Sequence, residues 1–102
     1  MSVVVVATLI PLPGHRDEVI AALTETIAKV HTEDGCELYA LHQAEERLVM
    51  IEKWASRETL DAHSRGAALA ALNPQLAGKV TGPPDVITLA AVPAGDPAKG
   101  QL

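Results

Sequence analysis

His63 and Glu52 are the two residues whose types and positions best fit acid–base chemistry in this sequence. Histidine changes its charge near neutral pH, which makes it the commonest general acid or base. Glu52 lies within an apolar stretch, where a carboxylate must find a partner or keep its proton. A hydrogen bond between Glu52 and His63 would satisfy both groups. Such a pair would serve catalysis, or it would only attach a helix to a sheet; we predict both residues as catalytic.

Tyr39 and Trp54 are the only Phe, Tyr or Trp residues in the chain. A flat ligand that stacks on an aromatic side chain must therefore meet one of them. Met50, Glu52 and Trp54 alternate along one apolar segment, so their side chains share a face if the segment is a strand. We predict Tyr39, Trp54 and Met50 as substrate-binding residues, with ordinary packing at a strand end as the alternative for Trp54.

The histidines and the single cysteine do not form a pattern typical of a metal site or a reactive thiol. The four histidines stand at positions 15, 31, 42 and 63, without the i, i+4 spacing of a helical metal site. Cys36 is the single cysteine, so a disulfide within the chain is impossible and a cysteine zinc site is not expected. We predict no metal site, and we expect Cys36 to act as a small buried hydrophobic residue.

The elements that would position these residues follow from hydrophobic patterning. β-Branched and apolar runs predict strands at 3–10, 36–42, 48–54 and 86–92. Apolar residues at helical spacing predict a helix at 16–32, which Gly35 follows as a natural stop. Ser56 is a candidate N-cap for a second helix, although Thr59 at the third position does not complete a standard capping box. A further helical stretch at 67–72 precedes Pro74, which is expected to start a new turn.

The resulting order is β-α-β-β-α-β, which is the ferredoxin-like arrangement of the α+β class. Its helices cover one face of the sheet only. The first and last strands are nevertheless apolar at almost every position, so both faces of the sheet are apolar. A second copy of the same sheet is the simplest cover for the remaining face, which predicts a homodimer.

Length and charge narrow the function classes further. The chain has 102 residues, enough for one domain, which we assign to 1–93 with a flexible C-terminal tail at 94–102. Thirteen acidic against eight basic residues give a net charge of −5, which argues against nucleic acid or a membrane as partner. The N-terminal apolar run lacks a basic n-region and is too short to span a membrane, so we expect a cytoplasmic location.

Three short segments in this order resemble the antibiotic biosynthesis monooxygenase family, and its quinol monooxygenases in particular. They are EDGC at 33–36 with Tyr39 close behind, VMIEKWAS at 49–56, and LDAH at 60–63. The resemblance covers about residues 3–93. It implies a dimeric α+β barrel with a pocket between sheet and helices in each subunit. It also implies oxygenation of a quinol or a polycyclic, anthrone-like phenol by dioxygen, with no cofactor. His63 matches a histidine that recurs in the family, which implies that it binds or deprotonates the phenolic oxygen, supported by Glu52.

Three other functions stay open on the same fold. A haem-degrading branch carries a ligating histidine where this chain has Asn73, and no histidine follows His63. An isomerase branch that acts on a small phosphorylated signal resembles residues 81–83, but has a basic residue where this chain has Pro84. A non-enzymatic, ligand-sensing or stress-associated dimer would keep the same pocket.

Overall fold

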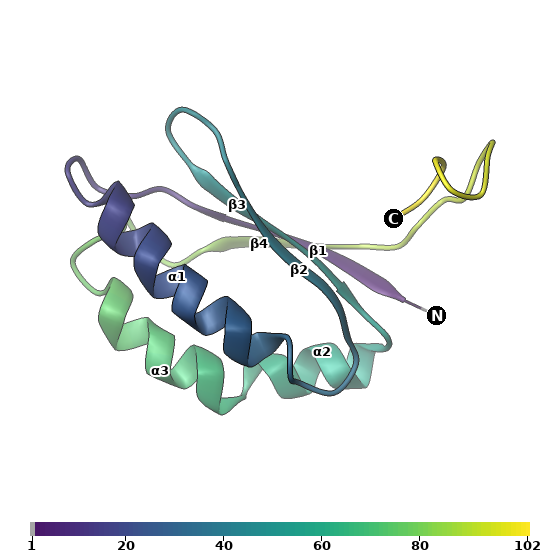
Figure 1. The fold of residues 1–102 in the computed structure, drawn as a ribbon, viewed down its shortest axis with the longest axis horizontal. Helices are drawn as coiled ribbons and strands as arrows, with labels where there is room; N and C mark the ends of the chain where they lie inside the picture. Colours follow the sequence, from purple (N-terminus) through teal and green to yellow (C-terminus); the bar gives the residue numbers. More distant parts are fainter. Residues whose placement is uncertain (1) are drawn as a thin grey trace.

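A computed structural model describes residues 2–102 as a four-stranded sheet with three helices along one face (Figure 1). The sheet is antiparallel, in the order β2-β3-β1-β4. This order and the β-α-β-β-α-β succession are those of the predicted ferredoxin-like α+β fold, with the second helical region split in two. The elements are β1 (Val3–Leu9), α1 (Arg16–Val30), β2 (Cys36–Gln43), β3 (Leu48–Trp54), α2 (Arg57–Ser64), α3 (Ala67–Leu76) and β4 (Asp85–Leu89).

Strict alternation on β3 separates the two faces of the sheet. Leu48, Met50, Glu52 and Trp54 are buried beneath the helices, whereas the residues between them are only half-buried. We call the helix-covered side the closed face and the other side the open face. The predicted alternation of β3 is confirmed, and it places Glu52 and Trp54 on the same side as Met50.

The open face carries apolar side chains with no helix above them. Ile51 on β3 lies opposite Val6 on β1, which in turn lies opposite Ile87 on β4. Ile87 is 50% exposed and Leu89 is 44% exposed. β4 stops at Leu89, three residues earlier than predicted, and Lys53 on the same face reaches the backbone oxygen of Leu102 at 2.8 Å.

Two local predictions on the helices were wrong. α3 continues through Pro74 to Leu76 rather than restarting there. Leu72 and Leu76 are both buried and lie one helical turn apart, so a continuous helix places both against the core. We infer that this burial outweighs the one backbone hydrogen bond that Pro74 cannot donate, close to the end of the helix.

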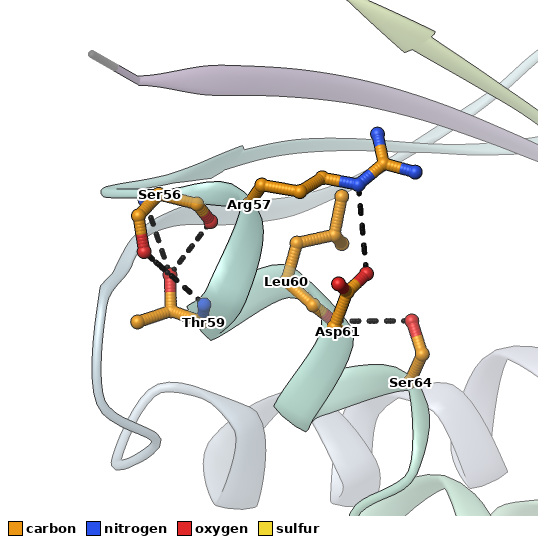
Figure 2. A network of polar contacts seen from close by, with 6 residues as sticks. All are labelled: Ser56, Arg57, Thr59, Leu60, Asp61 and Ser64. Atoms are coloured by element: carbon orange, nitrogen blue, oxygen red, sulfur yellow. Dashed lines mark hydrogen bonds and ion pairs between the residues drawn. The ribbon is translucent and has the colours of Figure 1, made fainter.

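The second correction concerns the start of α2. The Ser56 hydroxyl accepts from the Thr59 backbone N–H at 3.2 Å, and the Thr59 hydroxyl accepts from the Ser56 backbone N–H at 3.2 Å (Figure 2). A complete capping box is therefore present, with a threonine hydroxyl in place of the usual Glu or Gln. It starts α2 directly after β3 and so fixes where His63 falls.

Candidate active site

His63 lies on the buried side of α2, in contact with both aromatic residues of the sheet. Its side chain is 4% exposed. The imidazole stacks on the Trp54 indole, with ring centroids 4.5 Å apart and an interplanar angle of 29°. The Tyr39 ring meets it edge-on at 5.3 Å. The ring is thus confined between α2 and the closed face, which limits its orientation.

Two glutamates approach the two different nitrogens of this imidazole. The Glu33 Oε1 atom lies 2.8 Å from Nδ1, which is a hydrogen bond. The Glu52 Oε1 atom lies 4.0 Å from Nε2, which is too long for one. The predicted hydrogen bond between Glu52 and His63 was therefore wrong, and Glu33 is the hydrogen-bonded partner.

Trp54 is the hydrogen-bonded partner of Glu52. Its indole N–H donates to the Glu52 Oε1 atom at 2.9 Å, because the two side chains are two residues apart on the same face of β3. The bond satisfies the buried indole N–H and holds the carboxyl group beside the imidazole without reaching it.

Burial raises the pKa of Glu52. Desolvation is the main cause, the hydrogen bond from Trp54 and the charge of His63 oppose it, and the charge of Glu33 adds to it. Burial also raises the pKa of Tyr39, so its hydroxyl stays protonated at neutral pH. The closed face thus combines a carboxyl group whose pKa is raised with a neutral phenol, both beside one imidazole.

A cavity of about 150 Å³ opens between the closed face and the helices, and we call it the inner cavity. Four of the five predicted site residues line it: His63, Glu52, Tyr39 and Met50. Trp54, which is fully buried, does not line it but supports the His63 ring. Apolar side chains from the sheet and the helices make up most of the remaining wall, and Ser64 and Asn73 are further polar residues in it.

Metal-ligating side chains do not cluster in residues 2–102, and the one cysteine there is partly shielded from solvent. No group of three or more His, Cys, Asp or Glu side chains there is arranged to hold a metal ion. Glu33 and Glu52 approach opposite nitrogens of His63, so the three groups do not converge on one point. Cys36 is half-buried, and burial raises the pKa of its thiol, which disfavours the reactive thiolate.

Glu33 is the residue that sequence reasoning missed. It lies in the connection after α1, thirty positions before His63, and sequence reasoning used it only as part of the EDGC segment that resembles the family, without a role of its own. Its position depends on Gly35, whose positive φ of +79° turns the chain back towards β2. A Cβ atom at Gly35 would lie 2.5 Å from Thr59, so the turn also packs tightly against the start of α2.

None of the helices in residues 2–102 is long and apolar enough to cross a membrane. The longest of the helices described above, α1, has 15 residues, fewer than the roughly 20 that a bilayer requires.

Comparisons with known proteins agree with one another. The family model for antibiotic biosynthesis monooxygenase matches residues 2–75. A curated relative from Mycobacterium tuberculosis, Rv0793, whose name assigns it provisionally as a monooxygenase, is 36% identical over 63 residues. That match covers 60% of this chain and 62% of the relative, so it spans about three fifths of the relative's length.

Solved structures extend the likeness to the whole fold. The structure of Rv0793 superposes with a TM-score of 0.84 at 30% identity, covering 94% of this chain and 100% of that one. The structure of a Caulobacter crescentus CB15 protein that is provisionally assigned to the antibiotic biosynthesis monooxygenases superposes with a TM-score of 0.82 at 27% identity, covering 89% of this chain and 90% of that one. Since the family model covers well over half of the residues, the chain belongs to the antibiotic biosynthesis monooxygenase family.

Proposed function

We propose that this protein is a cofactor-independent monooxygenase that uses dioxygen to oxygenate a quinol. One observation carries the proposal: a buried imidazole, held at Nδ1 by a carboxylate, lines an apolar cavity. A carboxylate only accepts hydrogen bonds, so the Nδ1 atom of His63 is the donor in its bond to Glu33. In the neutral ring Nε2 then carries the lone pair, and it is the nitrogen on the side of Glu52, another residue of the cavity wall. His63 is therefore arranged as a base towards a bound phenol.

In this reaction the substrate itself supplies the electrons that reduce dioxygen. The site therefore needs a base and an apolar wall but no redox group of its own. His63 Nε2 takes the proton of one phenolic hydroxyl and leaves an electron-rich phenolate. Dioxygen oxidises this ring: the ring gains one oxygen atom and loses two hydrogens overall, and the second oxygen atom leaves as water. A hydroquinone thus becomes a hydroxyquinone without an external reductant. The apolar wall keeps bulk water from the reacting anion.

Cavity size favours one ring over several. A cavity of about 150 Å³ lined by apolar side chains is about the size that accommodates benzene in an engineered protein. The inner cavity has this volume, so a single-ring quinol fits it better than the polycyclic, anthrone-like phenol that the resemblance also allowed. Tyr39 and Met50 in its wall would contact the ring.

Glu52 has a supporting part in the proposal. Because burial raises its pKa, Glu52 takes up a proton more readily than an exposed glutamate does, and in the protonated form it could donate a hydrogen bond to an oxygen atom that becomes negatively charged. Its distance of 4.0 Å from Nε2 supports a role towards the substrate rather than towards the imidazole.

A homodimer completes the proposal. Domains of this family typically dimerise. The open face of this chain presents Ile51, Ile87 and Leu89 with no helix above them, and a second copy would bury them in the dimeric α+β barrel that the resemblance implied.

The test is oxygen uptake by the purified protein with a single-ring hydroquinone and with an anthrone. We expect uptake above the spontaneous rate with the hydroquinone, and a fall of about 10²-fold or more in His63→Ala, the contribution typical of a general base. His15→Ala is the matched control, since His15 is an exposed histidine paired with Glu18 outside the cavity, and it should keep the wild-type rate. Uptake with the anthrone alone would contradict the ring size. No uptake with either compound would favour the ligand-sensing alternative.

A further inference from the structure

Glu33 stands at the boundary between the buried site and the protein surface. Its backbone is fixed by hydrogen bonds from its own N–H to the Val30 oxygen at 2.9 Å and from the Cys36 N–H to its oxygen at 3.2 Å. Its side chain is 23% exposed, whereas that of His63 is 4% exposed. A side chain so placed can hold a buried group while remaining in contact with solvent.

The surface near Glu33 is hollowed as well. A groove, which we call the outer groove, runs between the end of α1 and the helices α2 and α3, and its lining includes Thr32, Glu33, Thr59 and Gly66. His63 lines both this groove and the inner cavity, and no other residue is common to the two linings. The imidazole therefore separates the two spaces, with Nδ1 towards Glu33 and Nε2 towards Glu52.

We infer that Glu33 is the positioning residue of this site: by accepting the Nδ1 proton of His63 it fixes the tautomer whose Nε2 lone pair meets the substrate in the inner cavity. The catalytic part of this inference rests on the proposed function, but the assignment of the tautomer does not. Glu52, the partner expected from the sequence, does not fill this role because its Oε1 atom accepts from Trp54 and stays 4.0 Å from the ring.

The proton balance of the step is simple. The phenolic O–H bond breaks, its proton forms a new bond to His63 Nε2, and the electron pair stays on the phenolic oxygen. The ring becomes an imidazolium that keeps its Nδ1 proton in the hydrogen bond to Glu33. The negative carboxylate stabilises this cation from the side opposite to the substrate, as the acidic member of a catalytic triad does. Glu33 itself need not take up a proton.

The first test reads the tautomer directly and needs no activity. Nuclear magnetic resonance of isotope-labelled imidazole nitrogens reports which nitrogen of a neutral ring carries the proton, and the signals of His63 are identified by their loss in His63→Ala. We expect Nδ1 to be protonated in the wild type. In Glu33→Gln the side-chain amide can either donate or accept, so we expect a mixture of the two tautomers.

Two matched variants isolate the effect of Glu33. Asp34→Asn removes one carboxylate at the neighbouring, exposed position, and Glu52→Gln removes the other carboxyl group near the ring. Both should leave the Nδ1 tautomer unchanged. A wild-type ring protonated on Nε2, or a Glu33→Gln ring that keeps the wild-type tautomer, would overturn the inference.

The second test applies once oxygen uptake is measured. Because Glu33 acts through His63 and lines no part of the inner cavity, Glu33→Gln should lower kcat about 10- to 100-fold and change KM by less than about twofold. A loss confined to KM would overturn the positioning role. If the wild type takes up no oxygen but shows the Nδ1 tautomer and its dependence on Glu33, the proposed function fails while the assignment of Glu33 stands.

Discussion

The two faces of the sheet carry similar apolar strands but hold different kinds of side chain. On the closed face, β3 combines Leu48 and Met50 with Glu52 and Trp54, and every one of these side chains is buried. On the open face, Ile51 is flanked by the apolar residues Val6 and Ala40 on the neighbouring strands. The buried acid–base groups are thus confined to the face that the chain covers with its own helices.

This difference separates two tasks. Removing a carboxyl group and an imidazole from water costs free energy that their hydrogen bonds with Trp54 and Glu33 offset, and titratable groups buried beside a cavity are candidates for a chemical role. The open face holds no buried acid–base group among the described residues. Its exposed isoleucine and leucine side chains are suited to contact with a second protein surface. Variants on the closed face should therefore change stability and chemistry, and variants on the open face should change assembly.

Trp54→Ala should have the largest effect, because it removes a fully buried indole that stacks on His63 and donates to Glu52. Loss of a buried aromatic side chain typically lowers the free energy of unfolding by about 3–5 kcal/mol. Trp54 is the only tryptophan, so the variant has no tryptophan fluorescence with which to follow unfolding. The measurement is therefore denaturant unfolding followed by circular dichroism. A loss below about 1 kcal/mol would show that the closed face is not packed as described.

Ile51→Glu is the corresponding change on the open face. A charge at this position would be buried without a partner in the proposed dimer. We therefore expect the dissociation constant of the dimer to rise at least about a hundredfold, which corresponds to about 2.7 kcal/mol. Sedimentation across a range of protein concentrations measures it. Ala21→Glu on the exposed side of α1 is the control and should leave the dimer intact. A wild type that sediments as a folded monomer would refute the assembly.

Gly35→Ala tests how tightly the turn after α1 packs against the start of α2. Gly35 and Gly78 both have a positive φ, +79° and +76°, so an alanine is strained at either position. Only at Gly35 would the new Cβ atom also meet another side chain, that of Thr59. We expect Gly35→Ala to destabilise by about 1–3 kcal/mol. Thermal unfolding should show a larger loss than in Gly78→Ala; equal losses would contradict the tight contact with α2.

Glu52→Gln should have the smallest effect, visible as a pH dependence. The pKa of Glu52 is raised in the folded state above 4.5, so the folded chain binds this proton more tightly than the unfolded chain. Wild-type stability therefore loses the contribution of Glu52 as pH rises above about 4.5 towards the folded pKa. Glu52→Gln keeps an oxygen acceptor for Trp54 and lacks this titration.

The measurement for Glu52 is the free energy of unfolding of both proteins across this pH range. The wild type should lose stability relative to Glu52→Gln as pH rises. A difference that stays constant with pH, or that changes with the opposite sign, would show that Glu52 is not held towards its neutral form.

Local patterns were enough to predict the order of the elements and which residues of β3 share a face, but not which of the two faces the helices cover. If 48–54 is a strand, its alternation predicts that Met50, Glu52 and Trp54 share a side, and the structure confirms this. The Glu33–His63 contact could not be found in this way, because it joins the connection after α1 to a residue on α2 thirty positions further along the chain. Local rules for helix ends also failed at two residues. At Pro74 the helix continues so that Leu76 is buried, and at Thr59 a hydroxyl group completes the capping box in place of Glu or Gln.

The central claim is that the inner cavity, with His63 as base, transfers one oxygen atom from dioxygen to a single-ring quinol. The most direct measurement is mass spectrometry of the product formed under heavy-isotope dioxygen. The account predicts a hydroxyquinone that carries one labelled oxygen atom, formed by the wild type and not above the spontaneous level by His63→Ala. An unlabelled quinone as the only product, or equal labelling by both proteins, would contradict it.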